Sequence, residues 1–339
     1  MSDSHRSDHL YALILAGGDG NRLKSLTTTA EGIAVPKQYC SLHGEVTLLD
    51  KALSRAAALV DTQHIYTVVA AHHQQWWKNL LEDYSPEQII VQPKNCGTAI
   101  GIMLPLLHIL QRDPDAHIVL LPSDHHVQEE EILTQSLLSA AQLLDHGAEQ
   151  LLILGMEPDE ADTELGYVLP GRRLNAGLAT VTSFIEKPPA MRAQLLVGQG
   201  ALWNTFIVAT RGTTLMKIFA QRCQNLLEEM QSIVSNAQEK RRYRTLLDEL
   251  YTRLPALDFS RDILQGLESM LGVLKVPFCG WSDLGTPRRI REVLHRWPRS
   301  SEIVAHSSHL PLSVNLAAHA SFILSKSLTG TPFPQAREA

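Results

Sequence analysis

The stretch "LAGGDGNRLKSL", residues 15–26, begins in an apolar run at 13–16 and is the most informative part of the sequence. It holds three glycines, Gly17, Gly18 and Gly20, and an arginine, Arg22. Glycines after a strand let backbone N–H groups turn toward an anion with no side chain in the way. The stretch therefore predicts an anion-binding loop at the carboxyl end of a strand.

Apolar runs rich in Ile and Val alternate with amphipathic segments along the first half of the chain. They predict strands at 11–16, 65–71, 88–91, 117–122 and 151–155, and helices near 47–60, 74–83, 98–111 and 129–144. The second half adds predicted strands at 167–169, 180–185, 203–209 and 273–277, a mostly helical stretch at 213–253 and a helix at 287–296. This alternation indicates a parallel sheet covered on both faces, with its ligand at the carboxyl ends of the strands.

Three glycine-loop patterns are compared with residues 15–26. A dinucleotide fold needs G-x-G-x-x-G and a P-loop needs G-x-x-x-x-G-K-[ST], and in both Leu23 occupies the place of a required glycine. The third pattern is G-G-x-G-x-R followed by P-K-Q, and the chain supplies Pro36, Lys37 and Gln38. Backbone donors, a guanidinium and an ammonium would then meet on one triphosphate and offset negative charge as pyrophosphate leaves. The alternative for Lys37 is an ordinary surface lysine after a turn proline.

The composition of the 339 residues excludes several classes of protein. Thirty Lys and Arg against 36 Asp and Glu give a net charge of −6, which argues against a broad nucleic-acid surface. The lack of a long apolar run argues against a membrane span, and the polar N-terminus does not resemble a secretion signal, so we expect a cytoplasmic protein. Four separated cysteines without a CxxC pair indicate reduced thiols. The doublets His72-His73 and His125-His126 lack spaced Cys or His partners, which favours loop histidines over a zinc site.

Eight motifs in order resemble the sugar-1-phosphate nucleotidyltransferases, most closely the mannose-1-phosphate guanylyltransferase branch. They are "LAGGDGNRL" and "PKQY" near the start, then "QPKNCGTAIGI" (92–102), "LLPSDHHV" (120–127), "ELGYVLPG" (164–171), "FIEKPP" (184–189), "LWNTFIV" (202–208) and "WSDLG" (281–285). The resemblance covers about residues 11–297. It implies a Rossmann-like α/β/α sandwich with a mixed, mostly parallel central sheet, sugar-binding insertions and a C-terminal extension.

The resemblance also implies roles for individual residues. Catalytic roles fall to Arg22, Lys37, Asp124 and Asp283; nucleotide contacts to Ala16, Gly17, Gly18, Gly20, Gln92, Gly97 and Thr98; and sugar-phosphate contacts to Gly166, Glu186, Lys187 and Asn204. Asp124 and Asp283 would hold Mg²⁺, whose preferred ligands are carboxylate and phosphate oxygens. The alternatives are a helix N-cap for Asp124 and a turn residue before Gly285 for Asp283.

The implied reaction transfers a nucleotidyl group from an NTP, expected to be GTP, to a sugar 1-phosphate, expected to be mannose 1-phosphate or a relative. Its partners would be these two small molecules, with a homodimer as the candidate assembly and neither nucleic acid nor membrane. A second hypothesis is a regulatory protein that binds a nucleotide or an NDP-sugar without transfer. A third, a cytidylyltransferase of isoprenoid synthesis, leaves the last three motifs unexplained.

The chain departs from the family pattern at several places. The glycine loop lacks the usual proline after Arg22, Leu165 replaces a glycine of "TGYGY", Phe206 replaces the glycine of "WNSG", and Ser260 follows Asp258 where the family has "SxD". All but the first lie on the acceptor side, so we expect an altered sugar pocket. The predicted organisation is a tail at 1–10, a nucleotide half at 11–155, a sugar-phosphate half at 156–297 and an extension of unassigned role at 298–339.

Overall fold

The computed structural model describes residues 8–29, 31–44, 46–174 and 177–296. The strands are β1 (Leu10–Ala16), β2 (Ile65–Ala70), β3 (Ile89–Gln92), β4 (His117–Pro122), β5 (Leu151–Met156), β6 (Gly166–Arg173), β7 (Leu178–Ile185), β8 (Leu202–Arg211) and β9 (Leu271–Lys275). The helices are α1 (Lys24–Thr27), α2 (Leu48–Ala57), α3 (Gln74–Trp77), α4 (Thr98–Arg112), α5 (Glu130–Asp145), α6 (Ala190–Gly198), α7 (Gly212–Val234), α8 (Lys240–Arg253) and α9 (Pro287–Arg296). Short helical turns are η1 (Asn21–Leu23), η2 (Lys37–Tyr39), η3 (Thr62–His64), η4 (Ala71–His73), η5 (Phe259–Leu264) and η6 (Glu268–Met270).

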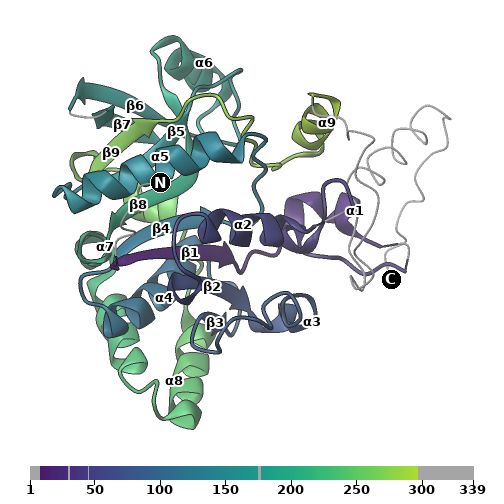
Figure 1. Ribbon diagram of the computed structural model, residues 1–339, viewed down its shortest axis with the longest axis vertical. Helices are drawn as coiled ribbons and strands as arrows, with labels where there is room; N and C mark the ends of the chain where they lie inside the picture. The colour runs from purple at the N-terminus through teal and green to yellow at the C-terminus, as the bar shows by residue number, and fades with distance from the viewer. Residues whose placement is uncertain (1–7, 30, 45, 175–176, 297–339) are drawn as a thin grey trace, which may run out of the picture.

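The described strands form one sheet in the order β3-β2-β1-β4-β8-β5-β9-β7-β6 (Figure 1). β1 pairs in parallel with β2 and β4, and β2 with β3, as predicted for the first half. β8 then runs antiparallel between β4 and β5, and β7 lies antiparallel to both β6 and β9. The mixed sheet is confirmed, but its second half is mainly antiparallel, because β8 enters it in the opposite direction.

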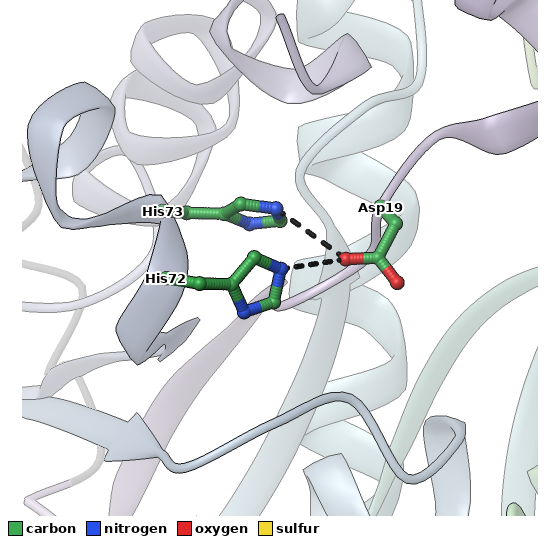
Figure 2. A group of neighbouring side chains, drawn as sticks. All are labelled: Asp19, His72 and His73. Carbon is green, nitrogen blue, oxygen red and sulfur yellow. Dashed lines mark hydrogen bonds and ion pairs between the residues drawn. The ribbon is translucent and has the colours of Figure 1, made fainter. Parts of the chain in front are cut away.

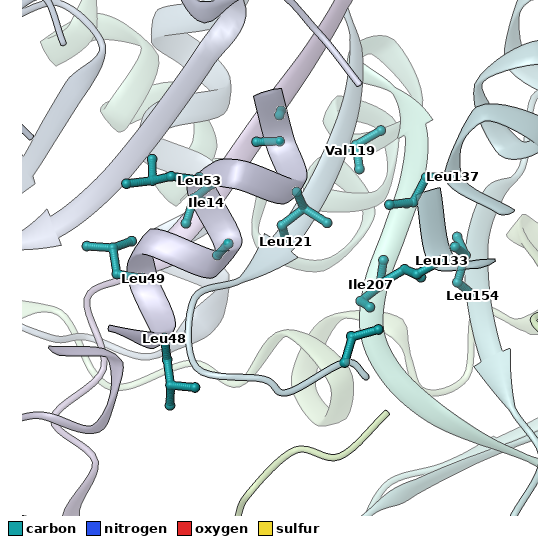
Figure 3. Close-up of a cluster of buried hydrophobic side chains, with 14 of the residues drawn as sticks. Ile14, Leu48, Leu49, Leu53, Val119, Leu121, Leu133, Leu137, Leu154 and Ile207 are labelled. Atoms are coloured by element: carbon teal, nitrogen blue, oxygen red, sulfur yellow. The ribbon is translucent and has the colours of Figure 1, made fainter. Parts of the chain in front are cut away.

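Helices cover both faces of this sheet. Along β1, Leu10, Ala12 and Ile14 pack in the core with α2 and α5, whereas Tyr11 and Leu13 face α4 and α7. This alternation is what a strand buried on both faces requires, since successive side chains point to opposite sides. Figure 3 shows the first of these cores, in which Leu residues of α2 and α5 meet apolar side chains of the sheet. The predicted α/β/α sandwich is confirmed.

Several element boundaries differ from the prediction. The helix expected at 74–83 ends at Trp77 and continues as turns, and the stretch at 213–253 divides into α7 and α8. The sequence pattern did not predict the helix α6. The carboxyl ends of β1, β2 and β3 meet at one edge, because these strands are parallel neighbours. That edge carries the glycine loop.

Other predictions concern the ends of the chain, its cysteines and membrane-spanning helices. The extension at 298–339 and most of the predicted tail lie outside the described residues. The four cysteines are free, as expected. Among the described helices, none has both the length and the hydropathy that crossing a bilayer requires.

Candidate active site

The glycine loop after β1 is held by the "PKQY" motif. Gln38 donates from Nε2 to the carbonyl oxygens of Ala16 and Gly18, at 2.9 Å each. Both acceptors are main-chain groups of the loop, and Gln38 is itself buried. The Gln38 amide therefore holds the loop in place, and the glycine loop and the "PKQY" motif lie together.

Lys37 lies between the two predicted metal ligands. Its Nζ is 3.0 Å from Oδ2 of Asp124, and it also donates to the main-chain carbonyl of Asp283. The residue is only 4% exposed. A surface lysine after a turn proline is therefore excluded, and one buried ammonium connects the Asp124 and Asp283 segments.

A short antiparallel pairing brings the two aspartates together. His126 and Ser282 exchange two main-chain hydrogen bonds of 2.9 Å, and the N–H of Gln128 bonds to the carbonyl of Cys279. Asp124 and Asp283 flank this pairing. The helix that follows Asp124 has Glu129 as its N-cap, so the N-cap alternative for Asp124 is wrong.

The charge of Lys37 favours an ionised Asp124 carboxylate, which can hold a cation. Burial raises the pKa of Asp124, but the charge of Lys37, helped by His125, outweighs it and leaves the pKa below its ordinary value. Oδ1 of Asp283 is buried and has no hydrogen bond within the described chain; Nε of Arg289 lies 3.6 Å away. Two carboxylates, one with an unsatisfied buried oxygen, are a donor set that fits Mg²⁺.

On the nucleotide side, Gln92 lies against the glycine loop. A Cβ at Gly17 would overlap the Gln92 side-chain amide, so a larger residue there would displace that amide. Oε1 of Gln92 is buried without a hydrogen bond among the described residues. An unsatisfied buried amide oxygen carries a desolvation cost, which a hydrogen-bond donor on a ligand could relieve.

The Gly97-Thr98 turn packs against the segment of Leu257 and Phe259, and its nucleotide role stays a prediction. The Gly97 backbone, at φ 86°, lies against Leu257, and the Thr98 hydroxyl accepts from the N–H of Phe259 at 2.8 Å. This packing explains why position 97 is glycine. The Arg22 guanidinium donates to Glu164 at 3.0 Å in an exposed ion pair, and its phosphate role stays a prediction.

Three of the four predicted sugar-phosphate residues converge. A Cβ at Gly166 would overlap the Glu186 carboxylate and contact Asn204. Asn204 donates to the Ser260 hydroxyl at 3.1 Å, so Ser260 lies in this group as well. Lys187 is exposed beside it. Burial and the nearby charge of Asp258 raise the pKa of Glu186 to about 7.

Comparison with known proteins agrees with this arrangement. The nucleotidyl transferase family matches residues 11–298 of the chain. The chain belongs to this family. The predicted resemblance to sugar-1-phosphate nucleotidyltransferases is thereby confirmed.

Curated relatives of this chain include mannose-1-phosphate guanylyltransferase 2 of Escherichia coli O157:H7. The two are 25% identical over 289 residues, which cover 82% of this chain and 58% of the relative. Xanthan biosynthesis protein XanB of Xanthomonas campestris pv. campestris is 27% identical over 282 residues, covering 81% of this chain and 57% of the relative. The chain thus spans less than three fifths of the length of both relatives.

A solved structure supports the fold. A crystal structure from Thermus thermophilus, described as mannose-1-phosphate geranyltransferase, superposes with a TM-score of 0.70 at 24% identity, covering 86% of this chain and 81% of that one. At this identity the likeness shows the fold.

The sequence did not reveal the roles of two residues in this candidate site. Gln38 was part of a recognised motif but had no assigned role. Arg289 is buried, donates twice to Asp162 at 2.9 and 2.7 Å, and lies 4.7 Å above the ring of Trp203. Its position in an arginine-rich helix resembles a solvated face, so no local signal could have identified it.

Strained backbone conformations occur at three motif residues, one of which, Phe206, departs from the family pattern. The described non-glycine residues with positive φ are Lys187 (47°), Phe206 (60°) and Leu284 (46°). Each lies in one of the motifs "FIEKPP", "LWNTFIV" and "WSDLG". Such conformations persist only where the surrounding structure imposes them, and they cluster at functional sites.

Proposed function

We propose that this protein transfers a nucleotidyl group from an NTP, with GTP as the expected donor, to mannose 1-phosphate or a related sugar 1-phosphate. The observation that carries the proposal is Lys37, buried between the Asp124 carboxylate and the main chain of Asp283 beside the glycine loop. The names of the curated relatives support the choice of base and sugar.

In this reaction an oxygen of the sugar phosphate attacks the α-phosphorus of the nucleotide in line. A new P–O bond forms, the bond to the β-phosphate breaks, and pyrophosphate leaves. The attacking phosphate is already ionised near neutral pH, so no general base is needed. Catalysis then depends on positioning and charge neutralisation.

The residues present divide these tasks between them. Backbone N–H groups of the glycine loop, with Arg22 and Lys37, would neutralise the phosphates, and Gln38 holds the loop in place. Asp124 and Asp283 would hold Mg²⁺, which when bound supplies further positive charge at the phosphates. Glu186, Asn204 and Lys187 would position the sugar phosphate.

A second candidate is a nucleotide-binding regulatory protein without transfer activity. The observation that favours it is Phe206 in a left-handed conformation where the family pattern has glycine. Binding of GTP or a GDP-sugar in calorimetry, with no turnover, would support it.

The test is pyrophosphate release by the folded protein with Mg²⁺ and a panel of NTPs and sugar 1-phosphates. Lys37→Ala should lower kcat/KM by roughly 10²–10³-fold, because one preorganised positive donor is lost. Lys217→Ala on α7 is the matched control and should match the wild type, since Lys217 is exposed. Release with no substrate pair, or full activity of Lys37→Ala, would contradict the proposal.

A further inference from the structure

Three side chains meet at the glycine loop, on the side of β1 where β2 lies. Asp19 comes from the loop after β1, and His72 and His73 come from η4, directly after β2. Nε2 of His72 is 3.0 Å and Nε2 of His73 is 3.4 Å from the same oxygen, Oδ1 of Asp19. Figure 2 shows both imidazoles directed at this carboxylate.

The spacing of these atoms matches a tetrahedral metal ion. Zinc lies about 2.0–2.2 Å from nitrogen and oxygen ligands, so neighbouring ligand atoms are roughly 3.3 Å apart. The two measured nitrogen–oxygen distances lie on either side of that value, and all three candidate atoms lie within 4.8 Å of one another. Little movement would be needed to bind an ion.

The surroundings hold the cluster in place. Asn95, in the loop after β3, donates from Nδ2 to the second oxygen of Asp19 at 3.3 Å, which turns Oδ1 toward the histidines. Asn95 is itself fixed, because its Oδ1 accepts from the N–H of Gly97 at 2.9 Å. The His73 side chain is 6% exposed and that of His72 is 50% exposed. A hydrogen-bonded outer partner and one solvent-accessible side are features of ligand sites with an entry path.

We propose that Asp19, His72 and His73 bind a transition-metal ion of the zinc class, at a site separate from Asp124 and Asp283. Two imidazoles and one carboxylate suit zinc, cobalt or nickel, whereas Mg²⁺ prefers oxygen ligands alone. Three protein ligands leave a tetrahedral ion one position for water or another ligand. Through these ligands the bound ion would connect the glycine loop to η4.

The competing explanation is a hydrogen-bonded Asp-His-His cluster that binds no metal, since the same distances suit charged hydrogen bonds. The two explanations differ in metal stoichiometry. Zn²⁺ alone is therefore the probe, titrated by calorimetry into chelator-treated full-length protein in the presence of excess Mg²⁺.

The matched variants are His72→Ala, Asp19→Asn and the control His146→Ala. His146 is exposed at the end of α5, and its ring contacts the main chain of Gln142. Wild type and control should bind one more equivalent of Zn²⁺ than the other two variants, whose affinity at this site should fall by more than roughly 100-fold. Added Co²⁺ should give the visible absorption of a tetrahedral complex in the same two proteins only.

Circular dichroism and melting without metal check that each variant is folded. Equal Zn²⁺ stoichiometry and affinity in wild type, His72→Ala and Asp19→Asn would overturn the proposal, as would a wild type that binds no Zn²⁺. The measurement is independent of the nucleotidyl transfer proposed above, because it reports metal binding and not turnover.

Discussion

At the scale of single residues, Phe206 shows how this chain departs from its family. Its φ of 60° lies in the left-handed region, where a residue with a Cβ costs about 1–2 kcal/mol. The conformation is held by the N–H of Phe206, which bonds to Oδ1 of Asn204, and by edge-to-face packing of its ring on Phe259 at 5.9 Å. Ring packing thus compensates for backbone strain.

Replacing Phe206 by glycine should therefore cost little stability. The relief of about 1–2 kcal/mol of strain offsets part of the packing lost with this half-buried ring. Phe206→Ala loses the same ring but keeps a Cβ in the left-handed conformation, so its free energy of unfolding should fall further than that of Phe206→Gly. Urea denaturation measures both, and equal losses would contradict the strain argument.

Glu186 is the second residue whose environment predicts a measurable effect. Its pKa is raised from 4.5 to about 7 by burial and by Asp258, against the opposing charge of Lys187. Between these two pH values the folded protein keeps a proton that the unfolded chain has released. The free energy of unfolding contributed by this group therefore falls as the pH rises from 4.5 to 7.

Glu186→Gln removes this dependence. The melting temperature of the variant minus that of the wild type should become more positive from about pH 5 to about pH 8, because only the wild type must ionise a buried carboxyl. The exposed Glu249→Gln on α8 is the control, and its difference should stay flat over the same range. A Glu186→Gln difference that is also flat would refute the raised pKa.

At the scale of elements, α9 anchors the segment that carries Asp283. Arg289 of α9 pairs with Asp162, in the segment before β6, and both side chains are buried. Arg289 also lies beside Asp283 and over Trp203. One guanidinium thus connects the end of the described chain, the segment before β6 and the strand β8.

Removing the Arg289 guanidinium should lower the free energy of unfolding. Arg289→Ala leaves the buried Asp162 carboxylate with Arg288 at 3.4 Å and the N–H of Glu164 as its remaining partners, so the loss should approach but not exceed the ~3–5 kcal/mol typical of an unpaired buried charge. The exposed Arg291→Ala in the same helix should change the free energy of unfolding by no more than about 0.5 kcal/mol. Chemical denaturation of the two variants gives the comparison, and a loss from Arg289→Ala no larger than that of its control would show that the pair adds nothing.

At the scale of the whole molecule, β8 joins the two halves predicted from the motifs. It pairs with β4 on one side and β5 on the other, and its first residues also pair with β6. The two larger apolar cores contain residues from each half, whereas a third, smaller core around Tyr167 and Trp203 belongs to the second half alone. The nucleotide and sugar-phosphate segments therefore share one sheet and two cores.

Such a molecule should unfold in one step. Urea unfolding followed by circular dichroism should have the same midpoint as tryptophan fluorescence of a Trp76→Phe/Trp77→Phe/Trp297→Phe variant, in which only Trp203 and Trp281 of the five tryptophans still report. The dichroism of that same variant is the internal control. Separate midpoints for the two signals would mean that the halves unfold independently.

The alternation of apolar strands with amphipathic segments was sufficient to predict the α/β/α layers, because burial on both faces of a sheet leaves a local pattern in the sequence. The glycine loop was predictable for the same reason, since Gly17, Gly18 and Gly20 are a local feature. Family motifs then pointed to Asp124 and Asp283. Their roles at the site stay predictions.

Only the tertiary structure decided which distant groups touch. The pairing of His126 with Ser282, the position of Lys37 between two aspartate segments, and the direction of β8 depend on contacts between residues far apart in the chain. The meeting of Asp19 with His72 and His73 is of the same kind: a histidine doublet resembles ordinary loop residues until the parallel order of β1 and β2 brings a carboxylate to it. Local patterns report burial, whereas chemistry between side chains depends on the packing of strands that are separate in the sequence.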